Sequence, residues 1–167
     1  MKYLLQNSIA LLSIGLLLGS TAATAQLTPA PPALLNTNAT TDTGNDVDPV
    51  ITTDGLGNWV AVWRSTENLA GAGADWDIFV ATSTDNGGSW SGPAPLNTNA
   101  TTDTGADFNP TITTDGLGNW VAVWRSKENL AGAGADWDIF VATSTDNGGS
   151  WSGPAPLNTN ATTDTGA

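Results

Sequence analysis

Acidic residues, arginine and tryptophan occur together at two places in this sequence, in a combination that could bind or cleave a sugar. The two sets are Arg64, Glu67, Asp75, Trp76 and Arg125, Glu128, Asp136, Trp137. A carboxylate beside an exposed tryptophan can bind carbohydrate, and two carboxylates at a suitable separation can hydrolyse a glycosidic bond. The alternative is that the tryptophans pack against neighbouring strands, since tryptophan is highly buried on average, and that the acids are only solvated.

The residue inventory excludes several kinds of site. The sequence contains no histidine and no cysteine, so the usual ligands of zinc, copper and haem are missing and no disulfide can form. Hard cations bound by oxygen remain chemically open. One alternative is a calcium loop using Asp42, Asp46 and Asp48, although their spacing matches no EF-hand pattern. We otherwise expect no cofactor.

The two sets recur because the chain contains a long internal repeat. Residues 35–105 align with residues 96–166 with five differences. The differing pairs are Asn45/Ala106, Val47/Phe108, Asp48/Asn109, Val50/Thr111 and Thr66/Lys127. A third copy begins at Leu157. Because nearly every candidate acid recurs in both copies, the pattern favours a scaffold over a unique catalytic site.

Each copy predicts four short strands. In the first copy these cover residues 49–53, 59–65 and 77–83, followed by an edge strand that starts near Trp90 and is interrupted by Pro93 and Pro95. The second strand is apolar on both faces, which is typical of a strand covered from both sides. Turn residues at 54–58 and 85–88 separate the strands.

A repeat of four antiparallel strands predicts an all-β fold built from β-propeller blades. A sheet that is apolar on both faces needs a neighbour on each side, which stacked blades supply. The predicted organisation is a signal peptide (1–25), an N-terminal segment with the first inter-blade connection (26–48), one blade (49–109), and a second blade with the start of a third repeat (110–167). Closed propellers have about 4–8 blades, so we expect an incomplete propeller. The alternative is one immunoglobulin-like sandwich of about seven strands.

An eight-residue phrase follows the third strand of each copy. Its key residues are Ser83, Asp85, Gly87, Ser89, Trp90 and Ser144, Asp146, Gly148, Ser150, Trp151. This phrase resembles the Asp box, or BNR repeat, of sialidases and related propellers. The resemblance implies a hairpin between the third and fourth strands of a blade, with a structural role. Turn chemistry agrees, because aspartate accepts bonds from turn amides, glycine tolerates positive φ, and tryptophan can wedge between sheets.

The sialidase resemblance does not extend to the catalytic residues. Sialidases use an arginine triad, a tyrosine–glutamate nucleophile and an aspartate acid/base. Here the one tyrosine is Tyr3, and the two arginines, Arg64 and Arg125, are copies of one position. We therefore predict no catalytic residue in this chain.

We expect an exported, non-catalytic module that binds carbohydrate or another extracellular ligand, or acts as a scaffold. Two alternatives stay open. The chain could be a fragment of a sialidase-like glycoside hydrolase with catalytic residues in further blades, or a two-blade protomer that closes a propeller by forming a homo-oligomer.

Strand connectivity predicts where a ligand would bind. Successive turns of an antiparallel blade alternate between its two ends, so the Asp box shares one end with the turn at 54–58. The loop at 66–75 and the connection at 97–109 share the other end, where longer loops favour a ligand site. Asp46, Asp48 and Asp107 join the candidate residues from the connections.

The N-terminus and the charge bear on localisation and partners. Lys2, an apolar run strongest over residues 9–18, and Ala23-Thr24-Ala25 predict a signal peptide cleaved before Gln26, hence a secreted or periplasmic protein. Cleavage leaves three cations against sixteen acids, a net charge of 3 − 16 = −13. Such a charge argues against nucleic acid and anionic membrane surfaces as partners, because both require a positive footprint.

Overall fold

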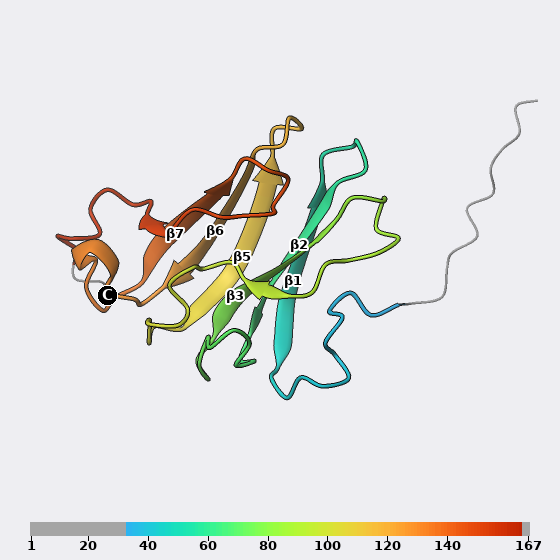
Figure 1. Ribbon diagram of the computed structural model, residues 1–167. Coiled ribbons are helices and arrows are strands. Elements are labelled where there is room, and N and C mark those ends of the chain that lie inside the picture. The colour runs from blue at the N-terminus through green and yellow to red at the C-terminus, as the bar shows by residue number, and fades with distance from the viewer. Residues whose placement is uncertain (1–32, 165–167) are drawn as a thin grey trace, which may run out of the picture. The chain divides into compact units, whose positions relative to one another are not determined.

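Two four-stranded antiparallel sheets make up the computed structural model, which describes residues 33–164 (Figure 1). The first sheet contains β1 (Asp46–Thr53), β2 (Trp59–Ser65), β3 (Asp77–Ser83) and β4 (Ala94–Pro95). The second contains β5 (Asp107–Thr114), β6 (Trp120–Ser126), β7 (Asp138–Ser144) and β8 (Ala155–Pro156). A single 3-10 turn, η1 (Leu130–Gly132), precedes β7. The predicted signal peptide lies outside the described residues.

Strand order identifies each sheet as a propeller blade. The strands of each sheet follow one another in sequence order, β1-β2-β3-β4 and β5-β6-β7-β8. An immunoglobulin-like sandwich would instead exchange strands between its sheets through Greek-key connections. The fold is therefore all-β and propeller-like, and its two sheets do not close a ring. Within residues 33–164, no helix has the length and apolar character needed to cross a membrane.

Strand boundaries agree with the sequence prediction at β2 and β3 and differ at β1 and β4. β1 begins at Asp46 rather than at Pro49, because it pairs with β2 on both sides of a bulge between Val47 and Val50. Asp48 lies in that bulge with φ +54, and a bulge also tolerates the missing N–H of Pro49. β4 has two residues and starts after Trp90, since Pro93 and Pro95 cannot donate ladder hydrogen bonds.

The two sheets pack unlike faces together. One face of the first sheet, with Val60, Val62 and Ile78, is buried against the opposite face of the second sheet. That opposite face contributes Ile112, Trp120, Ala122, Trp124 and Phe140 to the same core. β5 lies against β1, β2 and β3, as Figure 1 shows. The contact is head-to-tail, so the geometry that joins these two blades can join further blades.

Candidate functional site

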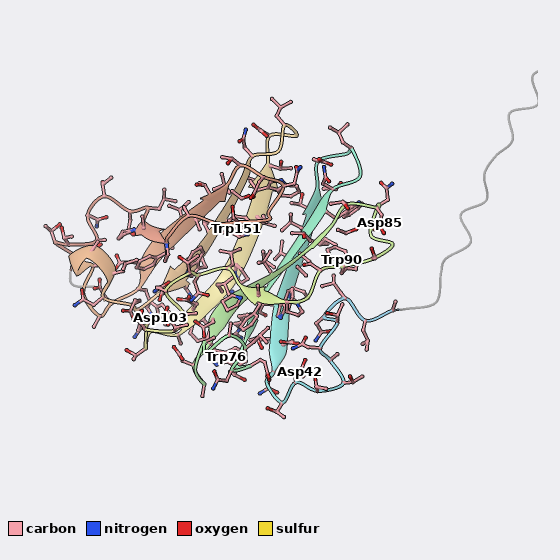
Figure 2. The ribbon with its side chains drawn as sticks, in the orientation of Figure 1. Asp42, Trp76, Asp85, Trp90, Asp103 and Trp151 are labelled. Atoms are coloured by element: carbon pink, nitrogen blue, oxygen red, sulfur yellow. The ribbon has the colours of Figure 1, made fainter. Side chains whose placement is uncertain are left out.

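The loops with the candidate ligand residues lie at one end of the sheets, as the sequence predicted. The backbone N–H of Asp107 donates to the carbonyl of Trp76 at 2.6 Å, which joins the β4–β5 connection to the β2–β3 loop. At the other end, the N–H of Asn86 in the Asp box donates to Gly57 at 3.0 Å. Figure 2 shows Trp76 and Asp103 at the first end and Asp85 and Trp90 at the other. We call the end with Trp76 and Asp103 the loop end.

Arg64 lies over two aromatic rings at the loop end. Its guanidinium carbon is 4.5 Å from the ring centroid of Trp76 and 4.5 Å from that of Phe108. Its Nε is also 2.7 Å from Asp48 Oδ2, an ion pair without the alignment of a hydrogen bond. The Phe108 ring comes from the second blade, so Arg64 links the two blades and its charge is already compensated.

Arg125 repeats the position of Arg64 with different neighbours. It lies 4.5 Å from the centroid of Trp137 and 5.7 Å from that of Phe108. Lys127 Nζ lies 4.8 Å from the Trp137 centroid. The counterpart of Asp48 is the neutral Asn109, and no acid pairs with Arg125 or Lys127 among residues 33–164. The three rings also contact one another, with centroids 6.4 Å apart for Trp76 and Phe108 and 5.5 Å apart for Phe108 and Trp137. The cations Arg64, Arg125 and Lys127 therefore lie over one row of aromatic rings.

Glu67 and Glu128 hold backbone at the loop end. Glu67 Oε2 accepts hydrogen bonds from the N–H groups of Thr43 and Gly44, both at 2.8 Å. Glu128 does the same for Thr104 and Gly105, at 3.1 and 3.0 Å. A Cβ on Gly44 would lie 2.4 Å from the nitrogen of Glu67, so glycine is required for this close approach. Both carboxylates thus stabilise the inter-blade connections.

Asp75 and Asp136 belong to acid clusters that the sequence did not indicate. The first cluster adds Asp77 and Asp103, and the second adds Asp138 and Asp164. Burial raises the pKa of Asp77 to about 7 and that of Asp103 to about 6. A sequence signal did exist: an Asp-x-Asp at the start of the third strand and an aspartate in the connection both belong to the loop end. The path of the connection cannot be read from the sequence, so the meeting of these aspartates could not be predicted.

Asp107 does not belong to this cluster and has other hydrogen-bond partners. Burial raises its pKa to about 8, and Ser126 and Trp124 donate hydrogen bonds to it. In the first blade, Asp46 accepts the corresponding bond from Trp63 Nε1 at 3.1 Å. These aspartates therefore satisfy the indole N–H of a buried tryptophan.

The three acids proposed for a calcium loop do not form one group. Asn36 Nδ2 donates to both Asp42, at 3.2 Å, and Asp46, at 2.7 Å, whereas Asp48 pairs with Arg64. The described acid groups close enough to share an ion do not include Asp42, Asp46 or Asp48.

Both Asp boxes form hydrogen-bonded hairpin turns at the end opposite the loop end. Asp85 accepts bonds from Ser83 Oγ at 2.8 Å, from the Ser89 N–H at 2.8 Å and from Ser89 Oγ at 2.6 Å. The bonds from Ser89 and Ser83 lower the pKa of Asp85 to about 2. Asp146 makes the same contacts with Ser144 and Ser150, which lower its pKa to about 2. Both oxygens of each carboxylate therefore accept hydrogen bonds within the turn.

The second Asp box also packs on the first blade. A Cβ on Gly148 would lie 2.9 Å from Val60 Cγ2 and 3.1 Å from Thr82 Cγ2. Trp151 packs against the inter-blade core, and its Nε1 donates to the Gly148 carbonyl at 3.2 Å. A hollow of about 450 Å³ adjoins this box, but no charged side chain lines it. It offers no acid or base for catalysis.

Comparisons with protein-family models and with curated proteins give no match. Among solved structures, the chain is similar to a Hadza microbial sialidase, with 17% identity, a TM-score of 0.50, and coverage of 65% of this chain and 25% of that chain. The chain has a sialidase-like β-propeller fold. A Trypanosoma rangeli sialidase (19% identity, TM-score 0.48, 68% and 20% covered) and a Penicillium chrysogenum alpha-L-arabinanase (14%, 0.48, 68% and 31%) are also similar.

This likeness confirms the resemblance at the level of the fold. At such identity it carries no catalytic residue over to this chain. The chain spans a quarter of the length of the Hadza sialidase that it matches, so the activity of a whole propeller does not follow from it.

Proposed function

We propose that the chain is a non-catalytic, exported propeller module whose loop end binds a carboxylate-bearing carbohydrate. One observation carries the proposal. All three cations of residues 33–164 (Arg64, Arg125 and Lys127) lie in the row of aromatic rings, although the predicted mature chain has sixteen acids.

The second blade supplies the part of the row that can bind an anion. Arg64 is paired with Asp48, whereas the counterpart of Asp48 in the second repeat is the neutral Asn109. Lys127 replaces the Thr66 of the first repeat. Two of the five differences between the repeats therefore raise the positive charge at one spot. A ligand carboxylate could accept charge-assisted hydrogen bonds from both cations.

The surroundings of Arg125 suit a sugar. Trp137 is 42% exposed, so part of its side chain is accessible to a sugar. A hollow of about 320 Å³ adjoins Arg125 and is lined also by Asn109, Val123, Trp124 and Ile139. That volume lies at the small end of known ligand sites.

The test uses exchanges between the repeats, which the fold already tolerates. Binding of acidic and neutral oligosaccharides is measured by calorimetry for the parent protein and for Asn109→Asp and Lys127→Thr. Each exchange should weaken acidic-sugar binding at least about tenfold, because hydrogen bonds to charged groups contribute roughly 1.5–3 kcal/mol. Neutral sugars should be unaffected. Asn45→Ala, a similar exchange away from Arg125, is the control. Absence of binding, or equal affinity in all variants, would contradict the proposal.

Two other functions have specific support. The fold likeness supports a fragment of a sialidase-like glycoside hydrolase whose catalytic residues lie in other blades, and hydrolysis of a fluorogenic sialoside by the product of the whole reading frame tests it. The open outer faces of the two sheets support a two-blade protomer that closes a ring by self-association. Size-exclusion chromatography tests that alternative. A stable two-blade monomer would contradict closure by self-association.

A further inference from the structure

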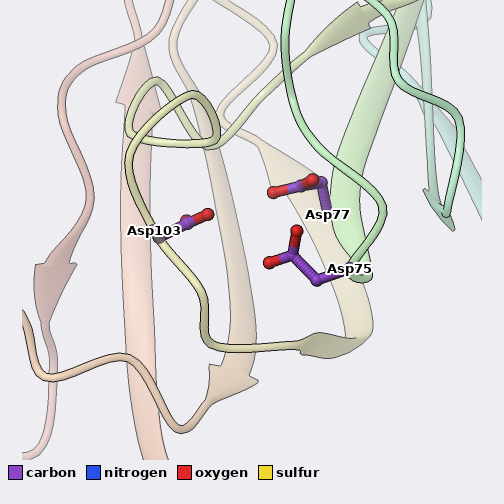
Figure 3. Close-up of side chains that lie close together, drawn as sticks. All are labelled: Asp75, Asp77 and Asp103. Carbon is purple, nitrogen blue, oxygen red and sulfur yellow. The ribbon is translucent and has the colours of Figure 1, made fainter.

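Three carboxylates converge at the loop end of the first blade. Asp75 and Asp77 come from the end of the β2–β3 loop and the start of β3, and Asp103 comes from the β4–β5 connection. One oxygen of each lies within 4.8 Å of one oxygen of each of the others. Figure 3 shows the three side chains pointing into one common space. The same arrangement recurs in the second blade with Asp136, Asp138 and Asp164.

Buried oxygens in these groups lack partners. Asp103 is 8% exposed, and its Oδ1 accepts no hydrogen bond from any described residue. Asp75 Oδ2 also accepts no hydrogen bond from any described residue. In the second blade, Asp138 is 1% exposed and its Oδ2 is unpartnered, as is Asp164 Oδ1. A buried charged oxygen without a partner costs several kcal/mol, so unpartnered oxygens at corresponding positions of both groups point to a cation site.

An asparagine side chain in each blade bonds carboxylates of these groups. Asn97 Nδ2 donates to Asp77 Oδ1 at 2.7 Å and to Asp103 Oδ2 at 3.2 Å, while its Oδ1 accepts from the Ile78 N–H at 3.1 Å. Asn158 Nδ2 donates to Asp138 Oδ1 at 2.6 Å in the second blade. In Asp103 and Asp138 these bonds use one carboxylate oxygen, and the other oxygen has no partner among the described residues.

Gly73 provides the room for Asp75. It has φ +99, and a Cβ there would lie 2.9 Å from Asp75 Oδ1. Gly134 has φ +97, and a Cβ there would lie 3.0 Å from Asp136 Oδ1. The loop therefore folds back closely over one carboxylate of each group.

We propose that each blade binds one calcium ion through these three carboxylates, at Asp75, Asp77 and Asp103 and again at Asp136, Asp138 and Asp164. Calcium takes oxygen ligands at about 2.3–2.6 Å, so two ligands of one ion can lie up to about 5 Å apart, as these oxygens do. Magnesium requires shorter distances and nearly ideal octahedral geometry. The ion would tie the start of β3 to the connection that leads to β5, and so fix one blade relative to the next.

Calcium alone is the probe for the test, added to the full chain after treatment with EDTA. Calorimetry should give two ions per chain, with a Kd of roughly 10⁻⁴–10⁻³ M as in other extracellular modules. The melting temperature should rise with calcium and rise less with magnesium. Asp103→Asn should bind one ion, and Asp164→Asn should also bind one.

Asp42→Asn is the matched control. Asp42 occupies the same position in the first connection and the same sequence context, but it belongs to no described acid group. It should leave the stoichiometry at two. Without calcium, Asp103→Asn should melt at a higher temperature than the parent, because it removes an unpaired buried charge, so unfolding does not obscure the result.

Three outcomes would overturn the proposal. They are no heat and no melting shift at millimolar calcium, two ions bound by Asp103→Asn, and an equal loss of binding in Asp42→Asn.

Discussion

The two repeats have almost the same sequence but very different surroundings. Ile78 of the first blade is 0% exposed, whereas its copy Ile139 is 41% exposed. On the opposite face the order reverses, because Ile51 is 50% exposed and its copy Ile112 is 8% exposed. Each buried residue of these pairs lies in the interface between the sheets. Position in the array therefore decides burial, and sequence does not.

The turns show the opposite behaviour. Asp54 accepts from the N–H of Leu56 at 2.7 Å and from Asn58 Nδ2 at 2.6 Å. Asp115 makes the same bonds at 2.8 and 2.6 Å. Contacts within a few residues are thus reproduced in both copies, whatever covers the sheet. The comparison separates local structure, which repeats, from packing, which depends on a neighbour.

Tryptophan truncation should show the largest difference between copies. Trp120 is fully buried in the interface, whereas its copy Trp59 is partly exposed. Trp120→Ala should lower the free energy of unfolding by about 3–5 kcal/mol, and Trp59→Ala by roughly half that or less. Urea denaturation at one fixed protein concentration measures both. Equal losses would show that the sheets do not pack as described.

The two Asp-box glycines provide a test of the close inter-blade contact. Gly87 and Gly148 have φ +81 and +80, so alanine costs about 1–2 kcal/mol at either position. Only at Gly148 would the new methyl group contact Val60 and Thr82 of the other sheet. Gly148→Ala should therefore cost about 1–3 kcal/mol more than Gly87→Ala. Thermal melting of the two variants measures this difference. Equal melting temperatures would show that Gly148 makes no close contact with the first sheet.

Acid should weaken both Asp boxes equally. The pKa of Asp85 and of Asp146 is about 2 in the folded protein, below the usual 3.8. A lowered folded pKa gives stability that is present above pH 4 and is lost as the pH falls toward 2. Asp85→Asn and Asp146→Asn should each be less stable than the parent at neutral pH, with the gap closing below pH 4. Circular dichroism against pH measures it, and a gap independent of pH would refute the assignment.

The smallest effect is expected from the ion pair of Arg64. Asp48→Asn copies the Asn109 of the second repeat and removes the pair with Arg64. Because Asp48 is 43% exposed in its side chain, the loss should be below about 1 kcal/mol. High salt should reduce the difference further. A loss of several kcal/mol, in urea denaturation at low salt, would instead make this pair a main link between blades.

The strands that are continuous apolar runs and the turns with local hydrogen bonds could be predicted from the sequence. β2 and β3 have the predicted bounds because each is a short apolar run that ends at turn or loop residues. The sequence prediction misplaced the start of β1, since a bulge at Asp48 has no local signature, and it began β4 too early. Among the site residues, Glu67 looked like a candidate ligand group, but its partners, Thr43 and Gly44, lie more than twenty positions away.

By itself, the sequence determined the repeat, the antiparallel blade and the two Asp-box hairpins, because these depend on contacts between residues near one another in the chain. Only the tertiary structure decided which sheet faces are buried, that Arg64 lies over Trp76 and Phe108, and that Asp103 meets Asp75 and Asp77. Those contacts join separate strands and separate blades. The ring contacts of Arg64 depend on the packing of the second sheet on the first, whereas the acid cluster depends on how the connection after β4 lies against its own blade. Neither contact can be predicted from residues that are close together in the sequence.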